Sequence, residues 1–483
     1  MSAPRILAID QGTTNTKAML VEPSGRIVAQ AAAPVASGYP RPGWAEQSAA
    51  DIWTSVQTVI AAIVAQEPHG ISGIAIANQR ETLVVWDAAT SQPICPAIIW
   101  QCRRTAETSA ALHAVGHNDT VEAATGLAIN PLFPAGKLAW VMAHVPQAAL
   151  LLAQGRLRAG TVDSWLLWNL TRGASFATDH SNASRTQLFN TATLEWDVAL
   201  ADIFGAPTAA LATPMPSDSL FGHTAATTAL PAGIPIHAMM GDSHAALYGH
   251  GVRTPGVVKA TYGTGSSLMA LTPKRMLSRH GLSGTIAWSQ GGKVAYAIEG
   301  NITVSAQAAA FAAQIMGVTV PALSDLAQTV PDAGGVTFVP ALAGLGAPHW
   351  NDHANGAISG LTLGTHRAHI ARATFEAIAC QIVDVFAAME QDCGQPLLGL
   401  LADGGASTNA FLMQLQADLL NRPVTRSDVA EVGALGAAAM AFSGMGIAVD
   451  PSASGQAFTS AMGQAERGDV LFKWQAAVAR ALA

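Results

Sequence analysis

Two short segments rich in glycine and threonine carry residues suited to binding a phosphate group. About 250 residues apart, they contain the sets Asp10, Thr13, Thr14 and Lys17, and Thr264 and Gly265. Apolar residues that favour β-strands flank each segment, which predicts two hairpins whose turns offer backbone N–H groups and hydroxyls to an anion. Asp10 can also hold Mg²⁺, directly or through water, and Lys17 adds positive charge. Two such hairpins indicate a nucleotide held between two related domains.

An ordinary surface turn is the alternative for either hairpin alone, because Asp and Gly residues commonly make turns without any ligand. The repetition of the pattern favours the functional interpretation. Neither segment has the Gly-Lys-Ser/Thr helix start of a Walker A loop, nor the GxGxxG helix start of a dinucleotide-binding fold. The sequence therefore predicts a different architecture, in which hairpins from two lobes clamp the nucleotide.

Asp242 follows an apolar run, residues 234–240, where a strand is expected to end. A carboxylate in this position can accept the proton of a substrate hydroxyl as that hydroxyl attacks a phosphoryl group. The alternative is a helix N-cap, a common role of aspartate, ahead of a short helix expected over residues 245–251. Both roles can coexist, and we expect Asp242 to be the general base.

Arg80 and Glu81 stand just after another apolar run, residues 71–77. Arginine donates hydrogen bonds in a fork and glutamate accepts them, so the two suit the hydroxyls of a neutral substrate. A surface ion pair of little energetic value is the alternative. Trp100, just before the polar residues 101–104, is a further candidate for the substrate, although tryptophan more often packs in a core or against a loop.

The apolar pattern also predicts the elements that position these residues. Further strands are expected over residues 28–35, 336–340 and 397–402, and a strand-then-helix unit over residues 158–170. Helices are expected over residues 52–66, 369–392 and 411–420, the first with Asp51 as its N-cap. Residues 252–256 are the expected domain boundary, since the second hairpin begins directly after them.

Length and composition agree with two domains that bind a small molecule. A chain of 483 residues is longer than a single hydrophobic core normally serves, so domains over residues 1–250 and 251–483 are expected. A hydrophobic fraction of 50% with 12% charged residues indicates large buried sheets. A net charge of −7 gives no electrostatic basis for binding nucleic acid.

The cysteines and histidines give no sign of a structural metal or a disulfide framework. The four cysteines are sparse, which predicts buried thiols in a reducing compartment: Cys95, Cys102, Cys380 and Cys393. His244, His349 and His353 lack the spacing of metal ligands. The N-terminus leaves no room for a secretion signal, and no apolar run reaches 18 residues, so we expect a cytoplasmic enzyme with no membrane partner.

Several motifs together resemble the FGGY carbohydrate kinases, and among them the glycerol kinases. These motifs occupy residues 10–14, 78–82, 99–104, 182–186, 261–265 and 344–348. The most specific part is the family's second signature, which residues 356–361 and 369–376 match at every position. The resemblance extends from the first hairpin to about residue 445.

This resemblance implies an α/β fold of two ribonuclease H-like domains of the actin and hexokinase type, with an ATP cleft between them. The N-terminal domain would bind most of the substrate and the C-terminal domain the nucleotide, with Mg²⁺ in the cleft. Carried over by motif, Asp242 is the catalytic base, and Asp10 lies near the metal. The residues implied at the ATP phosphates and adenosine are Thr13, Thr14, Lys17, Thr264, Gly265, Gly405, Ala406 and Asn409.

The same resemblance places Arg80, Glu81 and Trp100 at the polyol, and there the chain departs from glycerol kinase. Where glycerol kinase has Tyr, Gln and Phe, this chain has Leu132, Ser243 and Ser267. Groups that close around a three-carbon polyol have become smaller or apolar. We therefore expect a substrate larger than glycerol, namely a tetritol, tetrulose, pentitol or pentulose.

Other functions remain possible at this point. A true glycerol kinase is the first alternative, and a non-catalytic sugar or nucleotide sensor on the same fold is the second. Retention of Asp242 and of both hairpins argues against the sensor, since a sensor needs no base. An actin-like filament or chaperone ATPase is disfavoured by Arg80, Glu81 and Trp100. We also expect a homo-oligomer, either a dimer or a tetramer.

Overall fold

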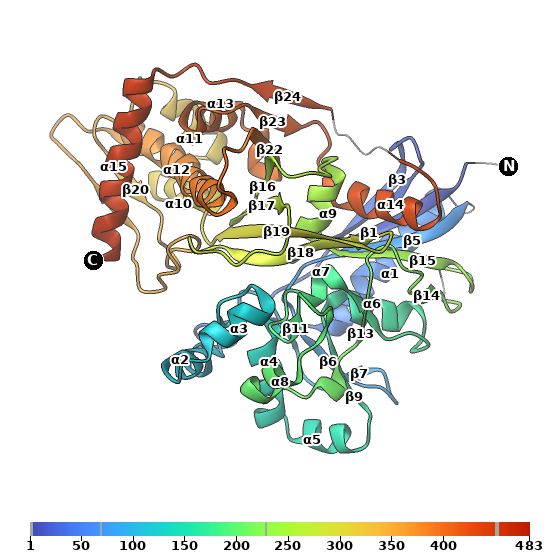
Figure 1. Ribbon diagram of the computed structural model, residues 1–483. Coiled ribbons are helices and arrows are strands. Elements are labelled where there is room, and N and C mark those ends of the chain that lie inside the picture. The colour runs from blue at the N-terminus through green and yellow to red at the C-terminus, as the bar shows by residue number, and fades with distance from the viewer. Residues whose placement is uncertain (1–2, 68–69, 228, 450–453) are drawn as a thin grey trace.

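A computed structural model of the chain describes residues 3–67, 70–227, 229–449 and 454–483. Two mixed sheets organise these residues (Figure 1). The strands of the first sheet are, in spatial order, β14 (Gly222–His223), β15 (Pro235–Gly241), β5 (Ile71–Asn78), β1 (Arg5–Gln11), β2 (Asn15–Val21) and β3 (Ile27–Pro34). Strands β1, β2 and β3 form an antiparallel meander, and β5 and β15 run parallel to β1.

The second sheet repeats this arrangement. Its strands are, in spatial order, β18 (Ser283–Gln290), β19 (Lys293–Ile302), β17 (Ser266–Thr272), β16 (Val257–Tyr262), β22 (Gly399–Asp403), β23 (Val424–Ser427) and β24 (Gly455–Phe458). Here β16, β17 and β19 form the antiparallel part, and β22 and β23 lie parallel to β16. The predicted fold of two ribonuclease H-like domains is confirmed.

Helices cover both faces of the first sheet because its strands are apolar on both sides. Leu7 and Ile9 of β1 pack in a cluster with α1 (Ala49–Gln66) and α6 (Val162–Leu170). Ile6 and Ala8 point to the other face and join a cluster with α9 (Asp242–Gly249) and α14 (Val432–Gly444). Met269 and Leu271 of the second sheet belong to this same cluster, so one apolar core lies between the two sheets.

Helix α14 comes late in the chain yet packs on the first sheet, against β1, β5 and β15 (Figure 1). It also crosses α9 at close range, and glycines permit the approach. A Cβ at Gly436 would lie 1.9 Å from the carbonyl oxygen of Ala245, and one at Gly249 would lie 2.2 Å from that of Val432. No side chain fits at either position, so the backbones of the two helices meet directly.

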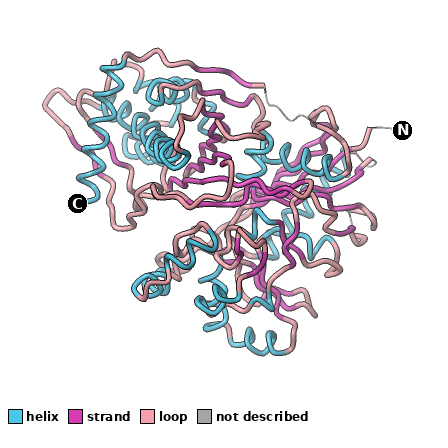
Figure 2. Tube along the Cα trace, in the orientation of Figure 1, coloured by secondary structure: helices cyan, strands magenta, loops and turns pink. Residues whose placement is uncertain are grey.

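The outer face of the second sheet is covered by a group of helices (Figure 2). They are α10 (Ala306–Met316), α11 (Val320–Ala327), α12 (Arg367–Cys393), α13 (Ala410–Leu420) and α15 (Gln464–Leu482). The short turn η2 (Gly405–Thr408) precedes α13, and the strands β20 (Thr337–Val339) and β21 (Ala357–Ser359) pair beside α12 and α15.

An insertion in the first domain, residues 79–221, forms a further group of helices and short strands beside the two sheets (Figure 1). Besides α6, its helices are α2 (Ala106–Ala114), α3 (Asn118–Thr125), α4 (Pro134–His144), α5 (Pro146–Ala153), α7 (His180–Ala183), α8 (Val198–Phe204) and η1 (Thr208–Ala210). One of its strands, β8 (Ala97–Ile98), pairs with β4 (Glu46–Gln47), which lies outside the insertion. The other strands of the insertion are β6 (Val84–Asp87), β7 (Gln92–Pro93), β9 (Leu157–Gly160), β10 (Ala177–Asp179), β11 (Phe189–Asn190), β12 (Glu195–Trp196) and β13 (Thr213–Met215).

Both predicted hairpins and the other predicted strands and helices are present, with two corrections at helix starts. The N-cap of α1 is Ser48, whose side chain accepts a hydrogen bond from the N–H of Asp51, so the prediction that Asp51 is the cap was wrong. Helix α9 starts at Asp242 and not near residue 245. Gly241 is its N-cap, so the alternative role of Asp242 as an N-cap was also wrong.

Two of the cysteines match the prediction of buried thiols, since Cys102 and Cys380 are buried, whereas Cys95 and Cys393 are half-buried. Among the described residues, no single helix combines the length and the apolar character needed to cross a bilayer. Helices α10 and α11 reach these limits only when taken together across a 91° bend. Their apolar side chains contribute to the core beneath the second sheet.

Candidate active site

The first hairpin places Asp10 at the end of β1, directly opposite Lys17 on β2. Thr13 is half-buried in the turn between them, where its hydroxyl bonds to Gln79 and Trp100, and Thr14 is exposed. Lys17 extends to Glu431, just before α14, with 2.7 Å between its Nζ and the Oε1 of Glu431. This ion pair connects the first hairpin to the segment between β23 and β24 of the second sheet.

Negative charge gathers around Asp10. Burial, with the charges of Asp242, Glu431 and Asp403 in support, raises the pKa of Asp10 to about 7, although Lys17 opposes the shift. The start of α14 closes this space, since a Cβ at Gly433 would lie 3.5 Å from Oδ2 of Asp10 and 3.4 Å from the carbonyl oxygen of Asp242. Carboxylates from both domains are thus close enough to Asp10 to act on its charge.

The second hairpin brings Thr264 and Gly265 to the turn between β16 and β17. A Cβ at Gly265 would lie 2.4 Å from the carbonyl oxygen of Ile302, so only glycine fits there. Gly404 has a positive φ of 89° and lies against Tyr262 at the end of β16, which brings η2 next to this hairpin.

The predicted adenosine residues lie in and after η2. Gly405 is exposed and Ala406 is half-buried. The side chain of Asn409 accepts from the N–H of Leu412, which caps α13, and donates to Ser324 Oγ at 2.9 Å. Gly405 and Ala406 therefore leave an open surface, while Asn409 also stabilises the helix behind it.

Asp242 is held by one oxygen and presents the other. Its Oδ1 accepts from Nε of Arg80 at 3.1 Å and from the backbone N–H of Ser243 at 2.6 Å. Its side chain keeps 39% of its surface exposed, which is unusual beside so many buried charges. A carboxylate fixed at one oxygen can use the other to accept a proton without first reorienting.

Arg80 and Glu81 are buried, so the alternative of a surface ion pair was wrong. Nη1 of Arg80 lies 2.7 Å from Oε1 of Glu299, and Glu81 accepts from Nε of Arg185 at 2.7 Å. Arg185 also reaches Glu299, with Nη2 3.0 Å from Oε2. Glu81 has a positive φ of 60°, a strained conformation that a binding site can hold when its surroundings fix the side chain.

Glu299, on β19 of the second sheet, stands between two arginines of the first domain. Its side chain is fully buried. Burial acts to raise its pKa, but the charges of Arg185 and Arg80 outweigh that effect and hold the pKa well below its usual range. In turn, the carboxylates of Glu299, Glu81 and Asp242 overcome burial and raise the pKa of Arg80. Both groups are therefore charged, and the cluster fixes the orientation of Arg80 against Asp242.

The remaining predicted substrate residues surround this cluster. Trp100 donates from Nε1 to Oγ1 of Thr13 at 2.9 Å, so it links the insertion to the first hairpin. Leu132 is half-buried, and its carbonyl oxygen accepts from Nζ of Lys137 at 2.7 Å. The same Nζ donates to the carbonyl oxygen of Glu81, also at 2.7 Å, and thereby supports the strained loop.

We expect Lys137→Met to lower stability more at high pH than at low pH. Burial lowers the pKa of Lys137 to about 7, below the value of about 10.4 for an unfolded chain. From about pH 7 to 10 the unfolded chain therefore binds a proton at Lys137 that the folded protein does not. Across this range the free energy of unfolding of the wild type rises with pH relative to that of Lys137→Met, and this gain is lost as the pH falls back to about 7.

Melting temperatures measured near pH 6 and near pH 9 test this expectation. Lys293→Met, at an exposed lysine at the start of β19, serves as the control. The gap between wild type and Lys137→Met should widen at the higher pH, while the control shows no such trend. An equal gap at both pH values would contradict the proposed neutral state of Lys137.

Ser243 and Ser267 meet although they come from different elements. Ser243 lies in the first turn of α9, next to Asp242, and Ser267 lies on β17 after the second hairpin. Their Oγ atoms are 2.9 Å apart, and Ser267 Oγ donates to Oε1 of Glu299 at 2.7 Å. The structure therefore brings Ser243, Ser267, Arg80 and Glu81 together around Asp242.

Several charged residues of the site had no assigned role from sequence, among them Arg185, Lys259, Glu299 and Glu431. Lys259 and Glu299 each interrupt an apolar strand, and a charge within such a run is the signal that could have identified them. Arg185 lies inside one of the family motifs at residues 182–186, without a role of its own. Glu431 offered no signal, since its partner Lys17 lies 414 residues away in sequence.

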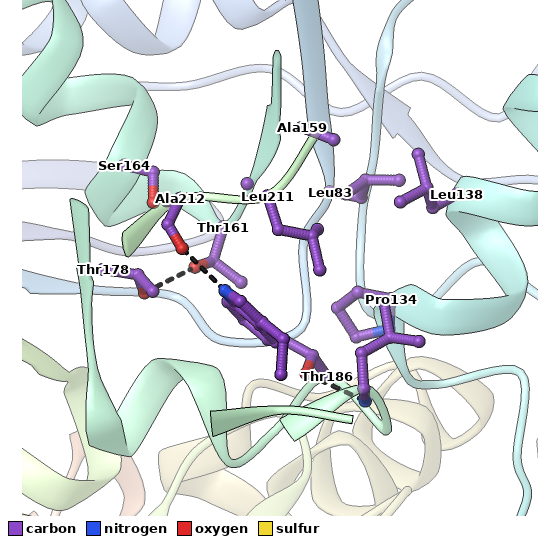
Figure 3. A pocket seen from close by; sticks show the side chains of 13 residues that line it. Leu83, Pro134, Leu138, Ala159, Thr161, Ser164, Thr178, Thr186, Leu211 and Ala212 are labelled. Atoms are coloured by element: carbon purple, nitrogen blue, oxygen red, sulfur yellow. Dashed lines mark hydrogen bonds between the residues drawn. The ribbon is translucent and has the colours of Figure 1, made fainter. Parts of the chain in front are cut away.

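A cavity of about 20 Å³ lies inside the insertion, and none of these four residues lines it (Figure 3). Leu83, Pro134 and Leu138 give it an apolar wall, and Ser164 gives it a hydroxyl that has no partner among the described residues. This volume suits about one water molecule. The cavity is thus a packing feature of the insertion and not a substrate site.

No cluster of three or more His, Cys, Asp or Glu side chains suited to a metal ion occurs in the described part of the chain. Magnesium in phosphoryl-transfer enzymes usually takes one or two protein carboxylates and completes its shell with water and phosphate oxygens. Asp10, with its raised pKa and its carboxylate neighbours, fits that pattern. A bound cation there would neutralise the charge that now disfavours the ionised carboxyl.

Two ribonuclease H-like domains, paired hairpin turns and an anchored carboxylate at a strand end are the arrangement expected of a small-molecule kinase. The N-terminal domain model of the FGGY family of carbohydrate kinases matches residues 5–249, and the C-terminal domain model matches residues 258–445. The chain belongs to the FGGY family of carbohydrate kinases.

Similar proteins agree with this assignment. The chain is 48% identical to the apulose kinase of Pectobacterium atrosepticum over 91% of this chain and 89% of that one. It is 43% identical to the glycerol kinase of Symbiobacterium thermophilum over 100% and 99%. A crystal structure of Plasmodium falciparum glycerol kinase with ADP superposes with a TM-score of 0.93, at 31% identity and coverage of 100% and 99%. Kinases of this family phosphorylate a sugar or a polyol, and the relatives give no support to the non-catalytic sensor considered above.

Proposed function

We propose that this kinase transfers the γ-phosphoryl group of ATP to a terminal hydroxyl of a small ketose or polyol, with Asp242 as general base. The observation that carries the proposal is the geometry of Asp242, with one oxygen held by Arg80 and Ser243 and the side chain still open. The substrate hydroxyl would lie at the free oxygen and lose its proton as it attacks. Glu81 and Trp100 would contact the other hydroxyls.

The nucleotide would lie between the two hairpins. Thr13, Thr14 and Lys17 would contact its phosphates from the first domain, and Thr264 and Gly265 from the second. Gly405, Ala406 and Asn409 would line the adenosine. Bound at Asp10, Mg²⁺ would neutralise charge on the phosphates. Catalysis of this kind depends on positioning and on exclusion of water, which two converging hairpins can supply.

We propose further that the substrate is larger than glycerol. Leu132, Ser243 and Ser267 are smaller or more apolar than the Tyr, Gln and Phe of glycerol kinase. In support, the Ser243 hydroxyl lies against Ser267 and the Ser267 hydroxyl donates to Glu299, so neither side chain offers a donor to a short substrate. The similarity to an apulose kinase makes apulose the first ketose to test. Glycerol remains the second candidate, because the similarity to a curated glycerol kinase covers the whole chain.

We expect glycerol to be a poor substrate. A short polyol forfeits hydrogen bonds in the wider site, and each lost bond lowers kcat/KM by about tenfold to a hundredfold. The assay measures ADP release with glycerol, apulose, tetritols, tetruloses, pentitols and pentuloses. If glycerol exceeds every longer substrate, the wider-site proposal is wrong. If no sugar or polyol is phosphorylated, the proposed activity itself is wrong.

The triple change Leu132→Tyr, Ser243→Gln and Ser267→Phe should shift preference toward glycerol. The ratio of kcat/KM for glycerol to that for the best longer substrate is the readout, because a loss of stability lowers both values together. Some loss is expected, since the change removes hydrogen bonds to Lys259 and Glu299. An unchanged ratio would show that these three positions do not set substrate size.

A further inference from the structure

Four side chains from four elements form one continuous row of hydrogen bonds beside Asp242. Lys259 on β16 donates from Nζ to Oγ of Ser243 at 2.7 Å. Ser243 Oγ lies 2.9 Å from Ser267 Oγ, and Ser267 Oγ lies 2.7 Å from Oε1 of Glu299. We call this row the hydroxyl chain. It begins at a buried amine and ends at a buried carboxylate, and the side chains of Lys259 and Glu299 have no exposed surface.

The two ends of the hydroxyl chain fix the direction of every proton in it. Glu299 lies between Arg80 and Arg185, is ionised and can only accept, so Ser267 must donate to it. A hydroxyl has one proton, so Ser267 has none left for Ser243, and Ser243 must donate to Ser267. Ser243 must then accept a hydrogen bond from Lys259, because an amine can donate in either protonation state.

Both serine protons are therefore used inside the protein. Each hydroxyl oxygen has two lone pairs, and one of them accepts from the preceding member of the chain. What remains is one free lone pair on each oxygen and no free donor. Ser243 is buried and Ser267 is half-buried, so the lone pair of Ser267 is the one that a bound molecule can reach.

We propose that Ser267 is a specificity residue that only accepts hydrogen bonds, and that Glu299 and Lys259 are positioning residues that keep it so. This inference rests on the proposed binding of a sugar or polyol at Asp242. Ser267 would then select a substrate carrying a hydroxyl donor at the facing carbon. It would reject a carbonyl, an ether or a fluorine at that carbon, because two acceptors facing each other in a dry site leave both unsatisfied.

The test uses deoxyfluoro analogues of the best substrate, each with one non-reacting hydroxyl replaced by fluorine, which cannot donate. Wild-type enzyme should lose about tenfold to a hundredfold in kcat/KM with the analogue altered at one particular carbon. Ser267→Ala should reduce that discrimination to within about threefold, and Ser267→Thr, which keeps the hydroxyl, should retain it. Ser266→Ala is the matched control, because the adjacent Ser266 bonds instead to Ser305.

A purely structural role for the hydroxyl chain would lower activity with substrate and analogue alike, and an unchanged discrimination in Ser267→Ala would overturn the proposal. Neutron diffraction from a deuterated wild-type crystal gives a test that needs no turnover. The deuteron of Ser267 should lie toward Glu299 and that of Ser243 toward Ser267. Either deuteron found elsewhere would refute the inference. Failure to phosphorylate any sugar would refute the proposed function, and the deuteron positions would still decide this inference.

Discussion

Replacing Asp242 with Asn is expected to lower kcat by about a hundredfold or more while leaving ATP affinity nearly unchanged. The amide oxygen of Asn can still accept from Arg80 and from the N–H of Ser243, so the local structure is retained. The amide cannot accept a proton from the substrate hydroxyl, and positioning alone remains. The proposed nucleotide contacts lie on the two hairpins and around η2, and they do not include this side chain.

Steady-state kinetics on the best substrate and calorimetric titration with ATP measure the two effects separately. Asp51→Asn is the matched control, since Asp51 is an exposed carboxylate in the first turn of α1. Near-normal turnover in Asp242→Asn would remove Asp242 from the role of base. A loss of ATP affinity equal to the loss of kcat would indicate a disturbed cleft instead.

Glu299→Ala is expected to lower the free energy of unfolding by about 3 to 5 kcal/mol. The substitution leaves Arg80 and Arg185 buried near each other without the carboxylate that compensates both. Arg185 has no exposed surface, so water cannot easily replace the lost partner. Arg80 would also lose its ion pair with Glu299, which helps to orient it toward Asp242, so activity should fall together with stability.

Urea unfolding of the full chain, followed by the midpoint of its main transition, measures this effect. Glu431→Ala is the control, because Glu431 pairs with Lys17 where 39% of the lysine side chain is exposed. Partly exposed ion pairs contribute at most about 1 kcal/mol. A loss in Glu299→Ala no larger than in the control would show that the arginine cluster tolerates an unpaired charge.

The two hairpins, the strands β5 and β15 and the helices α1, α12 and α13 could be predicted because their apolar periodicity is local. Residues 71–77, for example, are apolar or glycine apart from Ser72, and β5 occupies them and one more residue. The start of α9 could not be predicted in this way. Gly241 and Asp242 are both acceptable N-caps by residue type. Strand β15 ends at Gly241, and this residue is the N-cap of α9.

Burial of Arg80 and Glu81 was beyond local patterns for a different reason. Arg80 meets Glu299 across 219 positions of sequence, and Glu81 meets Arg185 across 104. Only the packing of the second sheet against the insertion brings these charges together. A charged pair at a strand end is normally exposed, and the sequence carries no local sign of partners so far along the chain.

Helix α14 makes the two halves of this kinase dependent on each other for folding. A fragment ending at residue 250 would lack the helix that covers Ile6 and Ala8, and would expose that face of its sheet to water. The complementary fragment would carry the apolar helix α14 without the first sheet, against which it packs. Each half therefore buries apolar surface of the other. We expect that a chain divided between the two family domains, near residue 250, does not give two units that fold independently.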